Sequence, residues 1–432
     1  MKKKRVVVLG AGISGLTAAY ALGKNHEVIL LEKSASSGGV MHAVEKEGFF
    51  FECGPRTFRT RGSPHLLALS EELGLTEQII GSCPAAKKRY VMLQKKIQEF
   101  PSSPLKFLFS PLCKGLRKGL LREWRQPRNE KDETIYAFAA RRFGEAVADR
   151  FFDPLSLGVF GCDARRVSIR SALPQLKEWE RLHGSVTGGL LRAVFRKRKA
   201  VAQTIKEPLF SFRQGTPMLV LALEKQLEGS IRLQEEVISL QKRDCLVVKT
   251  TQGEYPADMV VSALPPHALG RLIQDYAPDA AADLLSIPMT SMTVVHFGYS
   301  GSVLPCRGFG YLVPTSEQEK VMGVVFDSEI FPDHNKQSQT RLTIMLQGHC
   351  DDPVSISRDA LQRHLGIIQA PDVVHVGKNA LPVMEVGHSE KIASIQQALS
   401  LALPQLHLVG NYLGNPSIEH CIARALHADG SM

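Results

Sequence analysis

Residues whose types and spacing could bind a phosphate-bearing ligand lie near the start of the chain. The glycine-rich stretch Gly10-Ala11-Gly12-Ile13-Ser14-Gly15 follows an apolar run at 6–9, and Glu32 ends a second apolar run at 28–31. Such a turn, between a strand and a helix, lets backbone N–H groups approach a pyrophosphate. An acid at the end of the second strand can accept hydrogen bonds from a ribose. The order strand, turn, helix, strand, acid therefore predicts a dinucleotide site.

The residues after this acid narrow the choice of cofactor. Lys33 leads into a second glycine pair, Gly38-Gly39, followed by Val40 and by strands that we expect at 40–44 and 48–53. A Rossmann enzyme that uses NAD continues more often directly into its next strand–helix unit. A glycine pair at this place resembles the FAD-containing oxidases of the amine oxidase superfamily. The alternative is that the pair is only a turn between strands.

A second candidate ligand contact lies near the end of the chain. An apolar run at 406–409 leads into Gly410-Asn411, and the segment Asn415-Pro416 precedes a helical pattern. Asn415 is a suitable N-cap and Pro416 suits the first helical position. The N-terminus of that helix would stabilise the anionic edge of a reduced flavin. The alternative is a plain surface helix.

Composition bounds the class of protein. A chain of 432 residues with 44% hydrophobic residues can bury a large core and should form two or three domains. The eight cysteines contain no Cys-x-x-Cys pair, so we expect no metal site and read them as mostly buried thiols of an intracellular protein. We expect neither a membrane span nor a signal peptide, because the basic start at 2–5 leads into a glycine-broken strand. A cytoplasmic location follows.

The positive charge is concentrated in one segment. Residues 86–131 carry thirteen Lys or Arg and three Asp or Glu, a net charge equal to the +10 of the whole chain. Leu112, Leu116 and Leu120 recur at helical spacing within it, which is typical of a helix that binds a membrane surface or an anionic ligand. We therefore expect peripheral contact with the inner face of a membrane, with a solvated basic face as the alternative. No motif for nucleic-acid binding accompanies the charge.

The pattern of apolar runs predicts an α/β fold in which the dinucleotide domain is discontinuous. Helical spacing dominates 133–200, and strand-like runs return from 210 onward. We expect a Rossmann-type FAD-binding domain, a mixed α+β substrate domain and a helical insertion. The predicted division is 1–85, 206–265 and 383–432 for the FAD-binding domain, 86–205 for the helical insertion, which is a candidate membrane or substrate subdomain, and 266–382 for the substrate domain.

Longer stretches of the chain resemble the flavin-dependent protoporphyrinogen oxidase family. The stretches are 7–16, 48–56, 160–171, 211–219 and 408–425. The resemblance implies FAD as cofactor, molecular oxygen as electron acceptor, and oxidation of a porphyrinogen to a porphyrin by hydride transfer to flavin N5, most simply protoporphyrinogen IX in haem biosynthesis. Such a reaction needs orientation more than acid–base groups, so we expect no catalytic His or Cys.

The same resemblance implies the residues that hold cofactor and substrate. Besides the glycine turns and Glu32, the cofactor contacts are Lys33, Val40, Gly54, Pro55, Arg56, Thr57, Val237, Gly410, Asn411, Ser417 and Ile418. Arg56 and Arg89 are the expected contacts to a substrate propionate, because a guanidinium binds a carboxylate through two hydrogen bonds. Arg56 could equally be a structural salt-bridge partner.

Three alternatives remain open at this point. The substrate could be coproporphyrinogen III, whose four propionates would favour a more basic cavity. The chain could be an amine oxidase or carotenoid desaturase of the same fold. It could also be a binding protein of the Rab-escort type without redox chemistry, because fold alone does not determine function. The oligomeric state cannot be inferred from the sequence.

Overall fold

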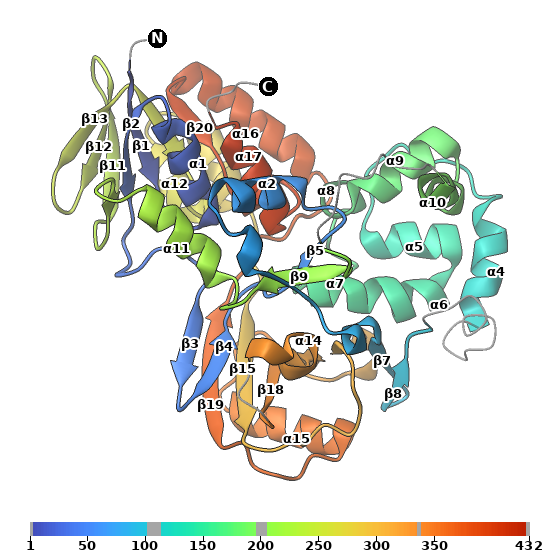
Figure 1. The fold of residues 1–432 in the computed structure, drawn as a ribbon. Helices are drawn as coiled ribbons and strands as arrows, with labels where there is room; N and C mark the ends of the chain where they lie inside the picture. Colours follow the sequence, from blue (N-terminus) through green and yellow to red (C-terminus); the bar gives the residue numbers. More distant parts are fainter. Residues whose placement is uncertain (1–2, 102–113, 196–204, 335–337, 429–432) are drawn as a thin grey trace.

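The computed structural model describes residues 3–101, 114–195, 205–334 and 338–428. Three groups of elements are visible in Figure 1: a parallel sheet between helices, a group of helices, and a large mostly antiparallel sheet. The predicted α/β fold class is confirmed. The predicted domain boundaries stay predictions.

The parallel sheet takes its strands from widely separated parts of the chain. In order across the sheet they are β10 (Ile231–Arg232), β2 (Glu27–Leu31), β1 (Arg5–Leu9), β14 (Met259–Ser262) and β20 (Leu406–Leu408). All neighbours run parallel. The chain moves from β1 outward to β2, while β14 lies on the other side of β1. Ligands of such sheets bind at the carboxyl ends of the strands where the order reverses, here beside β1.

Both faces of this sheet are buried. Successive side chains of β1 point to opposite faces and pack into two different cores. Val6 and Val8 pack among one set of helices, and Val7 and Leu9 pack among another. The first set is α1 (Ile13–Gly23), α2 (Pro64–Glu72), α11 (Pro217–Gln226) and α17 (Ile418–Leu426). The second is α12 (Pro266–Ile273), α13 (Pro278–Leu285) and α16 (His388–Ala402), with a small antiparallel sheet of β11 (Val237–Lys242), β12 (Leu246–Thr250) and β13 (Glu254–Ala257).

The large sheet has seven strands. In order they are β19 (Val373–Asn379), β15 (Met292–Tyr299), β18 (Thr340–Gln347), β17 (Val321–Val325), β16 (Gly310–Leu312), β7 (Tyr90–Leu93) and β8 (Lys96–Glu99). Helix α15 (Pro353–Leu365) packs on one face, against Phe297 and its neighbours. On the opposite face His296 meets the ring of Phe51 in β4 (Phe49–Glu52), whose hairpin partner is β3 (Ala43–Lys46).

A third small sheet connects the two larger ones. It consists of β5 (Phe58–Arg59), β9 (Leu209–Phe212) and β6 (Ile79–Gly81), all antiparallel to β9. Phe58, Phe210 and Phe212 pack into the core on one side of the parallel sheet. Short helix α14 (Asp327–Ile330) follows β17 and packs near residues 84–87. Figure 1 shows β5 and β9 between the parallel sheet and the seven-stranded sheet.

The helical group has its own apolar core around Phe138 and Ile169. Its members are α4 (Lys114–Glu123), α5 (Ile135–Phe143), α6 (Glu145–Val147), α7 (Asp153–Phe160), α8 (Ile169–Ala172), α9 (Pro174–His183) and α10 (Val186–Phe195). Within the predicted helical insertion, 86–205, residues 90–99 are not helical: they form strands β7 and β8. The edge of β16, which is far away along the chain, pairs with β7. This pairing decided that residues 90–99 form strands.

The expected amphipathic helix of the basic segment is present, but the side chains of its apolar stripe pack against the protein core. Helix α4 covers Lys114–Glu123, while Leu112 lies outside the described residues. Leu116 and Leu120 are partly buried against the core of the helical group. The apolar stripe therefore packs inside the protein, and Leu121 and Trp124 are the large apolar side chains that this region exposes.

Two composition-based expectations can be compared with the structure. All seven cysteines in the described ranges are free thiols, and Cys53, Cys162, Cys350 and Cys421 are buried. Within the same ranges, no helix is both long enough and apolar enough to cross a membrane.

Candidate functional site

The first glycine turn has the geometry that a pyrophosphate requires. Gly10 has a φ of +93°, and its N–H donates to the carbonyl of Leu31 at 2.8 Å. A Cβ on Gly15 would lie 1.8 Å from the Gly10 carbonyl oxygen, so only glycine fits there. A Cβ on Gly12, which precedes α1, would meet nothing within 4 Å. The space in front of the helix N-terminus is therefore open, and a phosphate can approach its N–H groups.

Glu32 lies directly after β2, at the same edge of the sheet. Its Oε2 accepts a hydrogen bond from the Ala11 N–H at 2.8 Å, and its Oε1 accepts one from the Ser34 N–H at 2.9 Å. Each carboxylate oxygen has a second lone pair, so the side chain can still accept a ribose hydroxyl. Val237 lies close by, because the N–H of Glu235 donates to the Glu32 carbonyl at 2.9 Å.

The second glycine pair packs directly on the first turn. The Gly38 N–H donates to the Ala11 carbonyl at 2.7 Å, and a Cβ on Gly39 would lie 3.4 Å from the Gly12 Cα. Gly54 is equally close to the following segment, since its Cβ would lie 1.9 Å from the Val40 carbonyl oxygen. The glycine pair and the Gly54 turn thus form a continuous backbone layer against the dinucleotide turn. This contact distinguishes the pair from a plain turn.

The C-terminal segment reaches the same edge of the sheet. Gly410, with a φ of +134°, follows β20 and starts a single turn of helix at Asn411–Leu413. The predicted N-cap Asn415 is wrong: Ser417 caps α17, and its Oγ accepts from the His420 N–H. Asn415 instead accepts the Ser417 N–H in the preceding turn, at 3.0 Å. Helix α17 packs along α1, as Figure 1 shows.

The structure therefore gathers the predicted cofactor residues from three separate parts of the chain. Gly10 to Gly15, Glu32 and Gly410 lie at the carboxyl ends of parallel strands, and Ser417 and Ile418 begin the adjacent helix. Lys33 and Val40 are exposed, and Pro55 and Thr57 are half-buried. Their individual contacts to a cofactor stay predictions. The open space at Gly12 and the close approach at Gly15 fit a dinucleotide.

Arg56 forms a salt bridge. Its Nη1 donates to Asp327 Oδ1 at 2.7 Å, and the two side chains are only 13% and 15% exposed. The other oxygen, Asp327 Oδ2, accepts the Thr343 hydroxyl at 2.7 Å. The geometry favours the salt-bridge interpretation that the sequence left open. A direct contact between Arg56 and a propionate stays a prediction.

A buried histidine continues this chain of hydrogen bonds. Because the Thr343 hydroxyl gives its one proton to Asp327, we infer that its oxygen accepts from His296 Nδ1, 2.9 Å away. Burial, with repulsion by Arg56, lowers the pKa of His296 to about 3. The imidazole is therefore neutral, and its buried Nε2 has no hydrogen-bond partner among the described residues.

A second acid supports the turn that carries Arg56. Glu52 is buried, and its Oε1 accepts the Thr216 N–H at 2.8 Å, while the Thr216 hydroxyl donates to the Pro55 carbonyl at 2.9 Å. Burial raises the pKa of Glu52. Thr216, in the stretch 211–219, therefore fixes the backbone at Pro55. Glu52 was missed by sequence reasoning, although an acid that directly follows three phenylalanines is an unusual strand residue.

Arg89 directly precedes β7, and Arg59 is the last residue of β5. The Arg89 guanidinium lies 5.1 Å from the ring centroid of Phe309. Both arginine side chains are exposed. The surrounding protein still removes part of the water around the Arg89 guanidinium, and this desolvation, with repulsion by Arg59, lowers the pKa of Arg89. Sequence reasoning named Arg89 and missed Arg59, which follows the GPR turn by only three positions.

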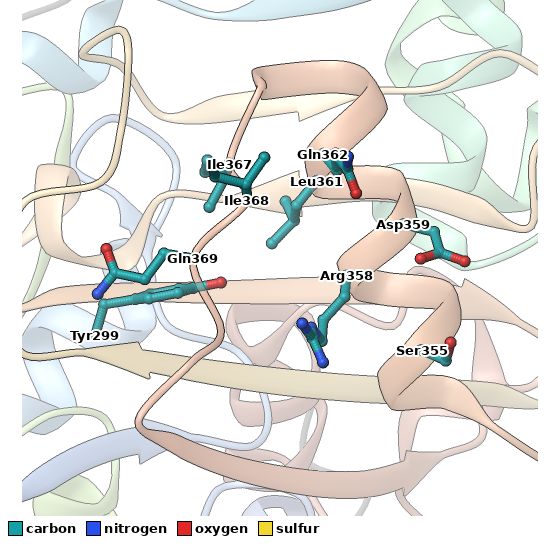
Figure 2. A pocket seen from close by; sticks show the side chains of 9 residues that line it. All are labelled: Tyr299, Ser355, Arg358, Asp359, Leu361, Gln362, Ile367, Ile368 and Gln369. Carbon is teal, nitrogen blue, oxygen red and sulfur yellow. The ribbon is translucent and has the colours of Figure 1, made fainter.

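A small cavity of about 170 Å³ lies elsewhere, on the α15 side of the seven-stranded sheet. Figure 2 shows Tyr299 of β15 and Gln369 on one side of it and Arg358 and Asp359 of α15 on the other. Ligand sites for drug-sized molecules measure about 300–1,000 Å³. This cavity is therefore too small for a bulky macrocycle, and it lies on the face of the sheet opposite to His296.

The parallel sheet, its two glycine turns and the adjoining antiparallel sheet define a dinucleotide-binding oxidoreductase with a separate substrate unit. A protein-family comparison gives the same class, because residues 13–368 match the model of the family "Flavin containing amine oxidoreductase". The chain belongs to this family. It is an oxidoreductase and its cofactor is FAD.

Curated relatives match almost the whole chain. Human protoporphyrinogen oxidase is 34% identical, and the match covers 97% of this chain and 96% of the human protein. Protoporphyrinogen oxidase of Schizosaccharomyces pombe is 27% identical, with 96% of each chain covered. The resemblance noted from the five sequence stretches is thus confirmed.

Solved structures agree on the fold. A protein from Exiguobacterium sp. 255-15 superposes with a TM-score of 0.85 at 21% identity, over 100% of this chain and 99% of that one. Cyclohexylamine oxidase from Brevibacterium oxydans IH-35A gives a TM-score of 0.71 at 16% identity, over 100% and 98% of the two chains. At these identities the similarity establishes the architecture alone.

Proposed function

We propose that this chain oxidises protoporphyrinogen IX to protoporphyrin IX, with molecular oxygen as the final electron acceptor. The observation that carries the proposal is the similarity to protoporphyrinogen oxidases along nearly the full length of both chains. The same chemistry on coproporphyrinogen III is the nearest alternative. FAD, when bound, supplies the oxidant that removes hydride from the substrate.

The boundary between the helical group and the seven-stranded sheet has side chains that suit an apolar macrocycle. Leu157 of α7 packs there with Met292 and Met322 of the sheet, beside the partly buried Met345. Methionine side chains are flexible and adapt to ligands of irregular shape. Gly161, at the end of α7, approaches the Met292 sulfur so closely that a Cβ would lie 2.4 Å from it.

The first test is porphyrin fluorescence in air. Purified protein reconstituted with FAD is offered protoporphyrinogen IX and coproporphyrinogen III in separate reactions, with flavin alone as the control for spontaneous oxidation. Faster enzymatic turnover of protoporphyrinogen IX supports the proposal. Faster turnover of coproporphyrinogen III would replace it by the alternative. Turnover of neither, in a protein that holds FAD, would contradict both and direct the search to amines and polyenes.

We also propose that the helical group contacts a membrane surface peripherally. Several of its large apolar side chains face solvent, namely Leu121, Trp124, Leu155, Val159, Leu182, Leu190 and Leu191. Lysines and arginines of the basic segment lie in the same part of the chain. Exposed apolar residues beside basic ones can insert into the headgroup region of an anionic bilayer.

Vesicle sedimentation tests this contact. Replacing Leu121, which is 78% exposed, and Trp124, which is 63% exposed, by Ser should weaken binding to vesicles that contain an anionic phospholipid. Leu401→Ser is the matched control, because Leu401 is 79% exposed on α16, outside the helical group. Equal binding by the double variant and the control would contradict the proposed surface.

A further inference from the structure

The small cavity beside α15 is a candidate binding site on the face of the seven-stranded sheet that lies away from His296. It measures about 170 Å³ and lies between Tyr299 of β15 and polar side chains of α15 (Figure 2). One water molecule takes up about 30 Å³ of liquid, so this volume admits a few waters or one small ligand. Its occupant is therefore a different molecule from FAD or a porphyrinogen.

Tyr299 contributes a buried hydroxyl to this cavity. The residue is only 1% exposed, and its ring packs edge-on against Phe297 with 6.3 Å between the ring centroids. Figure 2 shows the hydroxyl pointing toward α15. Among the described residues, this hydroxyl has no hydrogen-bond partner. Buried polar groups are almost always hydrogen-bonded, so a buried hydroxyl that lines a cavity indicates a polar occupant.

Arg358 adds a positive charge to the same cavity. It projects from α15, and within the part of the chain that the structure describes it forms no ion pair and no hydrogen bond. Burial raises the pKa of Tyr299 to about 12, while the charge of Arg358 acts to lower it, because the guanidinium lies near the phenol. At neutral pH both side chains are therefore hydrogen-bond donors, and together they match a negatively charged oxygen ligand.

Two acids near the cavity are held by other groups. Asp359 lines it as well, but Figure 2 shows this side chain on the outer side of α15, away from Tyr299. Arg363, four positions further along the helix, is close enough to interact with the Asp359 charge. Asp372, on the strand side, accepts the Ser300 N–H at 2.6 Å. These contacts leave the Arg358 charge available to a ligand.

The walls of the cavity belong to rigid elements. Helix α15 ends at Gly366, which has a φ of +70° and whose N–H donates to the Gln362 carbonyl at 3.0 Å. The chain therefore turns back, and residues 367–369 pass along the cavity. Leu361 and Ile367 are buried in the same apolar core as the Tyr299 ring. Side chains fixed in this way lose little conformational entropy when a ligand binds.

We propose that this cavity binds one small oxyanion, a phosphate or a short-chain carboxylate, between the Arg358 guanidinium and the Tyr299 hydroxyl. A guanidinium donates two parallel hydrogen bonds to either group, and the phenol adds a third. The proposal does not depend on porphyrinogen oxidation, because the cavity lies on the opposite face of the sheet from His296. An anion that bridges β15 and α15 binds only the folded protein, so it should raise the midpoint of thermal unfolding.

Thermal unfolding of the FAD-bound protein at increasing phosphate or acetate concentration tests the site. Sodium chloride at equal ionic strength is the reference, and bound FAD keeps free phosphate away from the glycine turn. The midpoint should rise and saturate with phosphate, with acetate or with both, and the anion that acts identifies the ligand class. Arg358→Gln and Tyr299→Phe should each raise the apparent Kd about tenfold, as expected for a lost hydrogen bond to a charged group.

Arg271→Gln is the matched control. Arg271 is an exposed arginine on α12 without an ion pair to any described residue, so this variant should keep the full response. An equal response by all three variants and the unaltered protein would overturn the proposal, because the anions would then bind elsewhere. No response beyond that of chloride would also overturn it and leave the cavity to water. Neither result bears on turnover of protoporphyrinogen IX, so the proposed function is tested separately.

Discussion

At the scale of the residue, Gly12 offers the sharpest test of the cofactor site. A Cβ there would meet nothing within 4 Å in the protein itself, and its φ of −71° suits any residue. Gly12→Val should therefore fold normally but block the approach of the pyrophosphate, and the purified variant should lack flavin absorbance. Gly23→Val is the control, because a Cβ at Gly23 is equally unobstructed at the far end of α1. Normal flavin content in Gly12→Val would disprove the placement of the phosphates.

His296 should make the free energy of unfolding depend on pH in the acidic range. Its pKa is about 3 in the folded protein, against about 6.5 in an unfolded chain. Between these values the unfolded state binds one more proton, so the free energy of unfolding falls as pH decreases, by up to about 1.4 kcal/mol per pH unit. Above pH 6.5 the group has no such effect.

Urea denaturation at pH 7.5 and at pH 5 measures this contribution. His296→Asn keeps a donor near Thr343 but cannot take up a proton, so the variant should lose less stability between the two pH values than the unaltered protein. Identical losses would show that His296 is not the buried neutral group described here.

At the scale of the element, Glu123 joins three helices of the helical group. This fully buried carboxylate ends α4, pairs with the fully buried Arg142 of α5, and accepts hydrogen bonds from Ser185 and from the Val186 N–H at the start of α10. Burial acts to raise the pKa of Glu123, but the hydrogen bonds from Thr187, Ser185 and Val186 outweigh it, and the pKa is lowered. Its stabilising effect is therefore present above its unfolded pKa and is lost as pH falls through the folded value.

Replacing this carboxylate should loosen the helical group. Glu123→Gln leaves the buried Arg142 with its longer ion pair to Glu180, at 3.4 Å, which we expect to cost up to about 3 kcal/mol and to expose α4 to limited proteolysis at neutral pH. Glu178→Gln is the control, because Glu178 pairs with Arg181 on the exposed face of α9 and should change proteolysis little. Equal resistance of the two variants would contradict the anchoring role of Glu123.

At the scale of the whole molecule, the FAD site depends on parts of the chain that are far apart. Strands β1, β14 and β20 lie side by side in one sheet although they start at residues 5, 259 and 406. Any ligand that binds the folded state alone raises its stability, by about 2.7 kcal/mol at a concentration one hundred times its Kd. We therefore expect FAD to move a single thermal transition upward. Calorimetry that instead resolved a second transition, unmoved by FAD, would show that the seven-stranded sheet unfolds independently.

The sequence alone determined the features that depend on neighbouring residues. The strand, glycine turn, helix and acid from residues 6 to 32 could be predicted because backbone sterics and apolar periodicity act within a few positions. The second glycine pair and the strand before Gly410 were predictable for the same reason. The N-cap at Ser417 was misjudged because Asn415 is an equally good cap by type, and only the geometry of the turn separates the two.

The tertiary structure decided every feature that depends on a distant partner. Arg56 and Asp327 are 271 positions apart, so no local pattern could show that this arginine is engaged. The same holds for residues 90–99, which form strands because β16 presents an unpaired edge. Local conformation follows from steric limits within each segment. Pairing across the fold follows from which faces are buried together, and that is fixed only when all segments pack at once.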